Sequence, residues 1–471
     1  AGGFLDVPRL IRRLSPRYRL KNFPDYSGDW TRLQGWSQMT MEEIPSQIGG
    51  KVVLPRNKER QDISSRFTQS KTVAVVGPSG TGKTVVAKLV AKRFGKDATV
   101  LWFNSEQFKG KGVSGLVPIL GLTHSLTKIL PNLTQSRGLV VLDGLERLVQ
   151  PAEFQALVRV FNAIDVSNSE SPWQVLATCQ IEHWPRIEAQ MRRFGISVVS
   201  WQLCSITEPR PEDLKLVWQI FPSLQSLALR PHLGKLLKQP KTLDLLALRS
   251  QAAESIDTAK WVGESDLIRW YWETYVRGVP DGNARSVFLQ RLAQLQADEG
   301  QYQTAITALD SAETALVGEL SQDGICHEHE ERIKFGHDLL GDWARQRSIL
   351  ANSSNLPFYL KDRATQPYWN RAIRLYGLHL LEQYEETTEW RDALDQLPFA
   401  QDLLLESIVF AANAEVLLER IWLDLEADEG HLLRRLLNRF LYAATYANPR
   451  LIALLDESET DGGPYARIHD R

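Results

Sequence analysis

Residues 77–84 have the sequence GPSGTGKT, in which two glycines, a lysine and a threonine stand at the spacing G-x-x-x-x-G-K-T. An apolar run at 71–76 precedes this segment, and an amphipathic stretch at 84–94 follows it. Glycines at this spacing let backbone N–H groups surround a polyphosphate, and the start of the following helix adds partial positive charge. The pattern therefore predicts a phosphate-binding loop between a strand and a helix.

Most residues of this loop have an expected role. We expect Lys83 to reach the β- and γ-phosphates of a nucleotide and Thr84 to bind Mg²⁺. The other loop residues expected to contact the nucleotide are Gly77, Pro78, Ser79, Gly80, Thr81, Gly82 and Val85. The alternative is a glycine-rich turn that binds no ligand.

The segment LVVLDGLERL at 139–148 supplies carboxylates for the same chemistry. Asp143 follows four apolar residues and is the expected second magnesium ligand. Glu146 is the candidate that orients the attacking water. An exposed glutamate at the start of a helix, with no role in catalysis, explains this residue equally well. Binding of ATP is therefore better supported than its hydrolysis.

Five apolar runs rich in β-branched residues alternate with helical stretches between residues 71 and 205. They occupy 71–76, 98–103, 138–143, 173–178 and 196–203. This alternation predicts a five-stranded parallel sheet with helices on both faces. Thr178 and Gln180, at the end of the fourth run, are expected on the γ-phosphate side, or else in a simple strand-end turn.

Helical patterns dominate after Pro211. Two predicted helices near 285–297 and 308–320 precede a predicted hairpin, the order typical of a winged helix. The predicted domains are a lead-in segment (1–50), a P-loop nucleotide-binding domain (51–206), a helical domain (207–278), a winged-helix domain (279–350) and an all-α C-terminal region (351–471) that begins a sensor.

Together these motifs resemble those of STAND-class NTPases, the signal-transducing branch of P-loop proteins that includes the NACHT and NB-ARC families. DGLE at 143–146 resembles the acidic motif of that class. The segment LLKQPKTLDLLA is similar to a helical segment whose proline packs against adenine, which places Pro240 there. VVLPRNKERQDI resembles the segment that lies over the base and ribose, with Arg56 at its polar position.

RIKFGHDLLGDWA resembles the signature that ends the winged helix of the class, with Gly336-His337-Asp338 in place of Met-His-Asp. The resemblance implies that His337 and ADP hold a closed monomer, whereas a histidine that caps its own helix is the alternative. It further implies an ATP/ADP-dependent, signal-transducing molecular switch that oligomerises on activation by an unknown protein trigger, in prokaryotic antiviral defence.

Two departures from the class predict slow ATP hydrolysis. Arg147 stands where NACHT proteins often carry another acid, and the fourth strand ends in Cys179-Gln180 where an arginine is common. Two other functions stay open: an AAA-type ATPase motor, and a nucleotide-stabilised scaffold with little hydrolysis.

Charge and composition limit the partners. Lys and Arg number 55 and Asp and Glu 57, so the net charge of −2 creates no general attraction to nucleic acid or anionic lipid. Between Arg291 and Arg332 there is no Lys or Arg, so we expect no DNA binding by the predicted winged helix. A basic stretch near the N-terminus is either a solvated segment or a site for an acidic partner; it contains Arg9, Arg12, Arg13, Arg17, Arg19 and Lys21.

Cysteine content and hydropathy indicate the compartment. Three cysteines among 471 residues are too few for a disulfide framework, which predicts a cytoplasmic protein. No apolar run reaches the 18 residues or so that a membrane span needs. Cys326, His327 and His329 do not match the spacing of a common structural zinc site.

Overall fold

The computed structural model describes residues 24–444 except for 109–115, 134, 167, 169, 197–200, 251–260, 262, 330, 385 and 412. The chain divides into two compact units, one of residues 1–225 and 238–254 and one of residues 226–237 and 255–471. The basic stretch from Arg9 to Lys21 lies outside the described residues. The five predicted domain ranges stay a prediction.

A five-stranded parallel sheet forms the centre of the first unit, in the order β2-β3-β4-β1-β5. Its strands are β1 (Thr72–Gly77), β2 (Thr99–Asn104), β3 (Gly138–Asp143), β4 (Trp173–Gln180) and β5 (Gln202–Ser205). The predicted five-stranded parallel sheet is confirmed. Strands buried on both faces read as continuous apolar runs, which is why the sequence reveals them.

Strand β5 ends later than the sequence predicts. The apolar run 196–203 suggests a strand there, and its residues 197–200 lie outside the described residues. Strand β5 pairs with β1 from Gln202 opposite Val73 to Ser205 opposite Val76, two residues beyond the run. Ile196 is buried in the hydrophobic core. Pairing with the neighbouring strand, which the local sequence does not encode, decides which residues enter the sheet.

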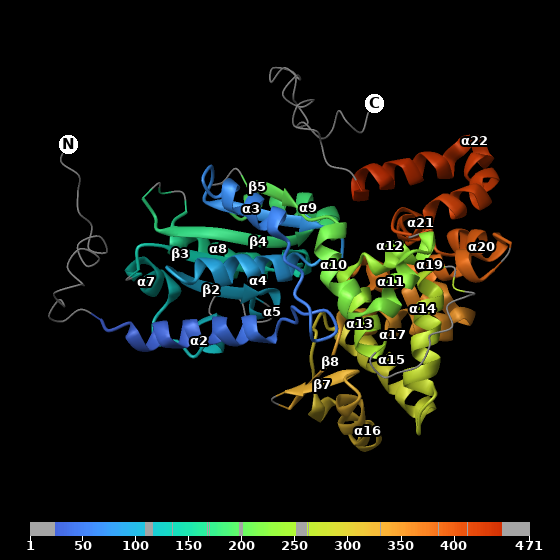
Figure 1. The fold of residues 1–471 in the computed structure, drawn as a ribbon, viewed down its shortest axis with the longest axis horizontal. Helices are drawn as coiled ribbons and strands as arrows, with labels where there is room; N and C mark the ends of the chain where they lie inside the picture. Colours follow the sequence, from blue (N-terminus) through green and yellow to red (C-terminus); the bar gives the residue numbers. More distant parts are fainter. Residues whose placement is uncertain are drawn as a thin grey trace. The chain divides into compact units, whose positions relative to one another are not determined.

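Helices cover both faces of this sheet (Figure 1). On one face, α8 (Pro151–Ile164) and α9 (Trp184–Arg193) pack against alternate strand residues such as Val140 and Leu142. On the other face, α3 (Asn57–Arg66) and α4 (Lys83–Phe94) pack against the intervening residues, including Val141. Successive strand side chains point to opposite faces, so both cores are apolar.

Helix α2 (Ser27–Glu43) lies along β2 at the edge of the sheet. The Ser37 hydroxyl donates to the Leu33 carbonyl at 2.7 Å and accepts the Trp102 amide N–H at 2.9 Å. At the other end of the helix, the buried Asp29 carboxylate accepts the Thr123 amide at 2.7 Å. Polar contacts of Ser37 and Asp29, together with the buried side chain of Leu33, therefore attach α2 to the domain.

Short helices complete the first unit. They are α5 (Ser105–Phe108), α6 (Leu116–Ile119), α7 (Leu126–Ile129), α10 (Pro211–Ile220) and α13 (Pro240–Ser250). Helix α11 (Pro222–Ala228) crosses into the second unit, which also contains α12 (Pro231–Leu237). Pro240 begins α13 because proline fits the first turn of a helix and not its interior.

Asp244 of α13 predicts a pH dependence of stability. Its Oδ1 accepts the Gly49 amide at 2.7 Å, and burial raises its pKa to about 6. The folded state then binds a proton more tightly than the unfolded state between about pH 4 and 6. Its contribution to stability is present at low pH and is lost as the pH rises through about 6.

Asp244→Asn should remove this dependence. We expect the free energy of unfolding of the variant, relative to wild type, to increase as the pH rises from 4 to 6.5 and to stay constant above. Urea unfolding at a series of pH values measures the difference, in which the other titrating groups cancel. A difference independent of pH would show that Asp244 keeps its ordinary proton affinity in the fold.

The second unit is mainly helical, and its helices follow in chain order. They are α14 (Glu264–Tyr271), continued by a π-helical segment (Trp272–Arg277), α15 (Gly282–Asp298), α16 (Ser311–Gln322), α17 (Asp338–Ala351), α18 (Leu356–Leu360), α19 (Pro367–Gln383), α20 (Thr388–Gln396), α21 (Gln401–Val409) and α22 (Ala414–Ala444). Helix α22 is interrupted at 427–430, where the backbone leaves the helical conformation.

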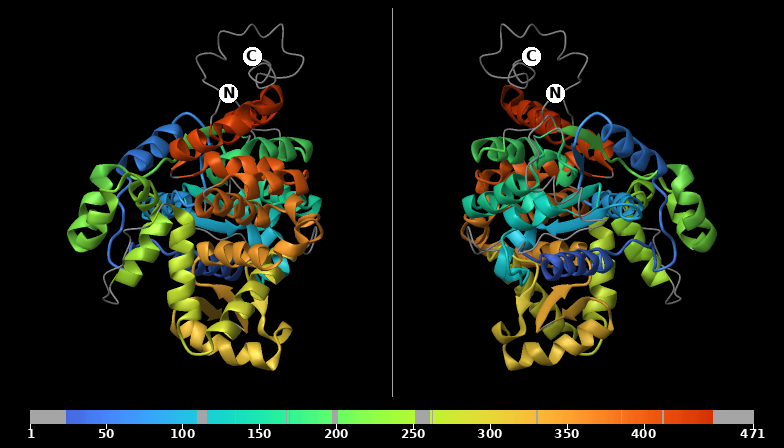
Figure 2. Two further views of the ribbon diagram at one scale, coloured as in Figure 1. Left: turned by 90° about the vertical axis from the view of Figure 1, so that its right-hand side faces the viewer. Right: turned by 90° about the vertical axis from the view of Figure 1, so that its left-hand side faces the viewer.

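A small antiparallel sheet lies beside α16 in this unit (Figure 2). Strands β6 (Thr304–Ala305), β7 (Cys326–His329) and β8 (Arg332–Phe335) form it in the order β6-β8-β7. The helices and the hairpin occur where the sequence predicts them. The assignment of this region as a winged helix stays a prediction.

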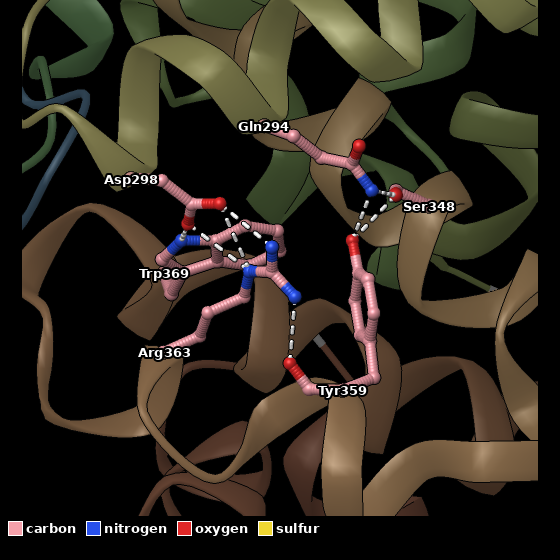
Figure 3. Close-up of polar contacts among 6 residues, drawn as sticks. All are labelled: Gln294, Asp298, Ser348, Tyr359, Arg363 and Trp369. Atoms are coloured by element: carbon pink, nitrogen blue, oxygen red, sulfur yellow. Dashed lines mark hydrogen bonds and ion pairs between the residues drawn. The ribbon is translucent and has the colours of Figure 1, made fainter.

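A polar cluster joins α15 to the helices that follow α17 (Figure 3). Arg363 donates to the Asp298 carboxylate through Nε at 3.0 Å and Nη2 at 2.6 Å, and Trp369 donates its indole N–H to Asp298 at 3.0 Å. The guanidinium also lies over the rings of Tyr359 and Trp369. The Asp298 carboxylate thus accepts hydrogen bonds from two side chains later in the chain, Arg363 and Trp369.

Asp298→Ala should destabilise this unit by about 2 kcal/mol, because the buried Trp369 indole and the Arg363 guanidinium lose their acceptor. Thermal unfolding should report a midpoint lower by about 4–8 °C. Arg391→Ala is the matched control, since the Arg391–Asp424 pair joins a largely exposed arginine and should contribute less than about 1 kcal/mol. Equal losses in the two variants would contradict a special role for Asp298.

Among the described residues, no helix combines the length and the apolar character needed to cross a membrane.

Candidate functional site

The glycine-rich loop connects the end of β1 to the first residue of α4. Gly80 and Gly82 have φ angles of +83° and +90°, in the left-handed region where a side chain would be strained. The Thr81 hydroxyl donates to the Pro78 carbonyl at 2.9 Å and closes the loop on itself. The predicted loop between strand and helix is present, and its conformation requires glycine at Gly82, a motif position, and at Gly80, a variable position of the motif.

Lys83 folds back over this loop. Its Nζ donates to the carbonyls of Gly77 and Pro78 at 2.9 and 2.8 Å, and the residue is buried. A buried ammonium group held by neutral carbonyls can exchange them for phosphate oxygens, which bind a cation more strongly. The lysine is therefore placed inside the loop that the sequence assigns to a polyphosphate.

Asp143 lies at the end of β3 next to the start of α4. Its Oδ1 accepts the Thr84 hydroxyl at 2.9 Å and the Thr178 hydroxyl at 2.6 Å. Burial raises the pKa of Asp143, and these hydroxyl donors together with the charge of Arg147 oppose the rise. A carboxylate and a hydroxyl in contact are hard oxygen donors, the type that Mg²⁺ prefers, so the two predicted ligands fit that ion.

Thr178 belongs to the Asp143 network. Besides donating to Asp143, its hydroxyl accepts the Gly144 amide at 2.9 Å, and the side chain is buried. The sequence predicts this residue near the γ-phosphate, and the structure shows its hydroxyl bound to the carboxylate of Asp143, the candidate metal ligand. The contact spans 35 positions in sequence, so no local pattern reveals it.

Glu146 lies on a 3₁₀ turn, Leu145–Arg147, directly after β3. Its Oε2 accepts the Gln180 amide at 3.3 Å, and Arg147 Nε lies 3.9 Å from its Oε1. Arg186 holds the turn by donating to the Glu146 carbonyl at 2.8 Å. The carboxylate is buried and fixed, so it is not an exposed helix-start glutamate.

Arg56 is buried with a left-handed backbone, at φ +47°. The Asp213 carboxylate accepts its amide at 3.2 Å, and its Nη2 donates to the Thr207 carbonyl at 2.7 Å. In the part of the chain that the structure describes, its Nε and Nη1 have no hydrogen-bond partner. Buried donors without acceptors are costly, so this position suits an acceptor from a bound molecule.

Pro240 lies beside the glycine-rich loop, and so does the next residue. A Cβ added to Gly82 would come 3.9 Å from Pro240 Cγ, and one added to Gly80 would come 4.0 Å from Lys241 Cδ. The structure thus brings the start of α13 to the loop. The sequence motifs do not single out Lys241, and its position directly after Pro240 is the only local signal for it.

His337 belongs to the second unit, where it caps its own helix. Its Nδ1 accepts the Leu339 amide at 3.2 Å at the start of α17. With Nδ1 accepting this hydrogen bond, Nε2 is the ring nitrogen that can face another group. The capping interpretation describes this local geometry, and the role of His337 towards a nucleotide stays a prediction.

The loop with its lysine, the metal-side aspartate and the parallel sheet define a P-loop nucleoside triphosphatase site. Residues 73–199 match the family model described as the ATPase family associated with various cellular activities (AAA). The chain therefore contains an AAA-family P-loop NTPase domain. No curated protein matches the sequence.

Three solved structures are similar at low sequence identity. The Walker-type ATPase of Pyrococcus abyssi is 12% identical, with a TM-score of 0.36 over 64% of this chain and 97% of that one. The Orc1 protein of Aeropyrum pernix in complex with DNA is 15% identical, with a TM-score of 0.32 over 64% and 95%. The RuvB Holliday junction branch migration motor of Thermotoga maritima is 16% identical, with a TM-score of 0.28 over 62% and 95%. The family match, and not these similarities, supports the assignment.

Proposed function

We propose that this chain binds ATP with Mg²⁺, hydrolyses it slowly, and uses the difference between ATP and ADP as a signalling switch. The observation that carries the proposal is the contact between Thr84 and Asp143 beside the buried Lys83. These three residues come from the two motifs that P-loop ATPases use for phosphate and metal.

Each residue has a chemical task in this proposal. Lys83 neutralises the β- and γ-phosphates, and Thr84 and Asp143 hold the metal, with Thr178 orienting the carboxylate. Bound Mg²⁺ would supply charge neutralisation on the phosphate oxygens. Glu146 would accept a hydrogen bond from the attacking water and orient it. Arg56 and Pro240 would contact the nucleoside.

The switch function includes assembly. In the proposed cycle ADP and His337 favour a closed monomer, and exchange for ATP after a protein trigger favours oligomers. A cytoplasmic role in prokaryotic antiviral defence is consistent with the STAND-like order of motifs. The AAA-type ATPase motor is the second candidate, and the AAA family match favours it more directly than it favours signalling.

Steady-state turnover separates these functions. A switch should hydrolyse ATP at well below one per second, whereas a motor should turn over rapidly and depend on an arginine supplied by a neighbouring subunit. Glu146→Gln should lower the rate of a switch or a motor, and no change would favour a scaffold. Rapid turnover by the purified wild-type protein would overturn the switch proposal.

The proposed role of His337 in holding the closed monomer has its own test. His337→Ala should shift the protein towards assemblies with ATP, measured by light scattering. Glu328→Ala, a change in β7 of the same small sheet, provides the control. If His337→Ala stays monomeric under conditions where wild type assembles, the proposed role of His337 in the closed monomer is wrong.

A further inference from the structure

Arg147 follows the two acidic residues of the candidate site and ends the 3₁₀ turn after β3. Its Nε lies 3.9 Å from Glu146 Oε1, while Oε2 of the same carboxylate accepts the Gln180 amide. The Arg147 amide also donates to the Gly144 carbonyl at 3.1 Å. Both oxygens of Glu146 therefore face N–H groups of the protein itself.

The arginine side chain folds back across the turn. A Cβ added to Gly144 would come 3.3 Å from Arg147 Cδ and 3.4 Å from its Nε. The guanidinium is thus held over the backbone between Asp143 and Glu146, with a side chain that is 30% exposed. This placement comes from the 3₁₀ turn, which brings residue 147 back towards Gly144.

We propose that Arg147 is a positioning residue that slows ATP hydrolysis by holding the Glu146 carboxylate. A guanidinium group about 4 Å from a carboxylate oxygen attracts that oxygen and competes with water for it. The inference rests on the proposed function, in which Glu146 orients the attacking water.

Arg147→Gln should therefore raise kcat for ATP by about three- to tenfold, because the released Glu146 oxygen could accept a hydrogen bond from the attacking water. KM and the Kd for a fluorescent ADP analogue should stay unchanged. Arg147→Lys keeps the charge and should remain near the wild-type rate. Arg192→Gln is the matched control, because Arg192 forms an exposed pair with Glu188 at 2.9 Å.

A double variant tests whether Arg147 acts through Glu146. Arg147→Gln combined with Glu146→Gln should show no acceleration over Glu146→Gln alone. The nucleotide that copurifies with the protein gives a readout independent of turnover. The ADP fraction, measured by chromatography after denaturation, should rise in Arg147→Gln.

The outcomes separate the two proposals. An unchanged or lower kcat in Arg147→Gln, with an unchanged melting temperature, overturns the role of Arg147 and leaves nucleotide binding intact. If Arg147→Gln is poorly folded, Arg147→Lys decides, and a tenfold change in its rate would count against the proposal. If wild type binds no ATP, the proposed function and this inference both fail.

Discussion

Lys83→Ala is expected to weaken ATP binding by about a hundredfold. The ammonium group is buried in the glycine-rich loop, where it donates to two loop carbonyls and would exchange them for phosphate oxygens. Charge-assisted hydrogen bonds contribute about 1.5–3 kcal/mol each, so losing them at two phosphates costs about 3 kcal/mol or more. Isothermal titration calorimetry at fixed Mg²⁺ and salt would measure the change.

Alanine variants of two other lysines provide comparisons for the ATP affinity of Lys83→Ala. Lys92 lies on the same helix and is exposed. The Lys92→Ala protein should therefore bind ATP with wild-type affinity. Lys241→Ala should weaken binding by about five- to tenfold, because Lys241 flanks the loop at Gly80 and offers one partly solvated contact. Equal affinity of wild type and Lys83→Ala would refute nucleotide binding at this loop.

Asp143→Asn is expected to lower ATP turnover by about a hundredfold or more. The substitution keeps an oxygen that can accept the Thr84 and Thr178 hydroxyls, so the fold of the site should persist. It removes the negative charge that would hold Mg²⁺, and a divalent cation depends strongly on that charge. Steady-state phosphate release over a range of Mg²⁺ concentrations measures the effect.

The binding of ADP without Mg²⁺ is the internal control for Asp143→Asn. It should change by less than about threefold, because the phosphates then contact Lys83 and the loop amides. Asp97→Asn, an exposed aspartate of the same unit, should leave both measurements unchanged. Wild-type turnover by Asp143→Asn would mean that the metal is held elsewhere.

The local patterns predicted the elements well. The run GLVVLD predicts the residues of β3, and the loop spacing predicts where β1 ends and α4 begins. Both predictions succeed because strand burial and phosphate binding depend on residues close together in sequence. Strand β5 shows the opposite case, since its end at Ser205 depends on pairing with β1 and not on its own hydropathy.

The arrangement of the candidate site depended on distant residues. Asp213 fixes the Arg56 backbone across 157 positions, and Thr178 reaches Asp143 across 35. Lys241 lies beside Gly80 only because α13 folds onto the loop. A sequence motif gives the chemical type of such residues but not their partners, which the packing of separate elements determines.

The attachment of α2 to β2 has a consequence for self-association. An edge strand presents unpaired amide and carbonyl groups that can template the addition of another chain. The Ser37 hydroxyl occupies the Trp102 amide, and the body of α2 lies along that edge. The sheet is thus closed to strand addition at β2, so any physiological assembly must use side-chain surfaces and not a continuous intermolecular β-sheet on that side.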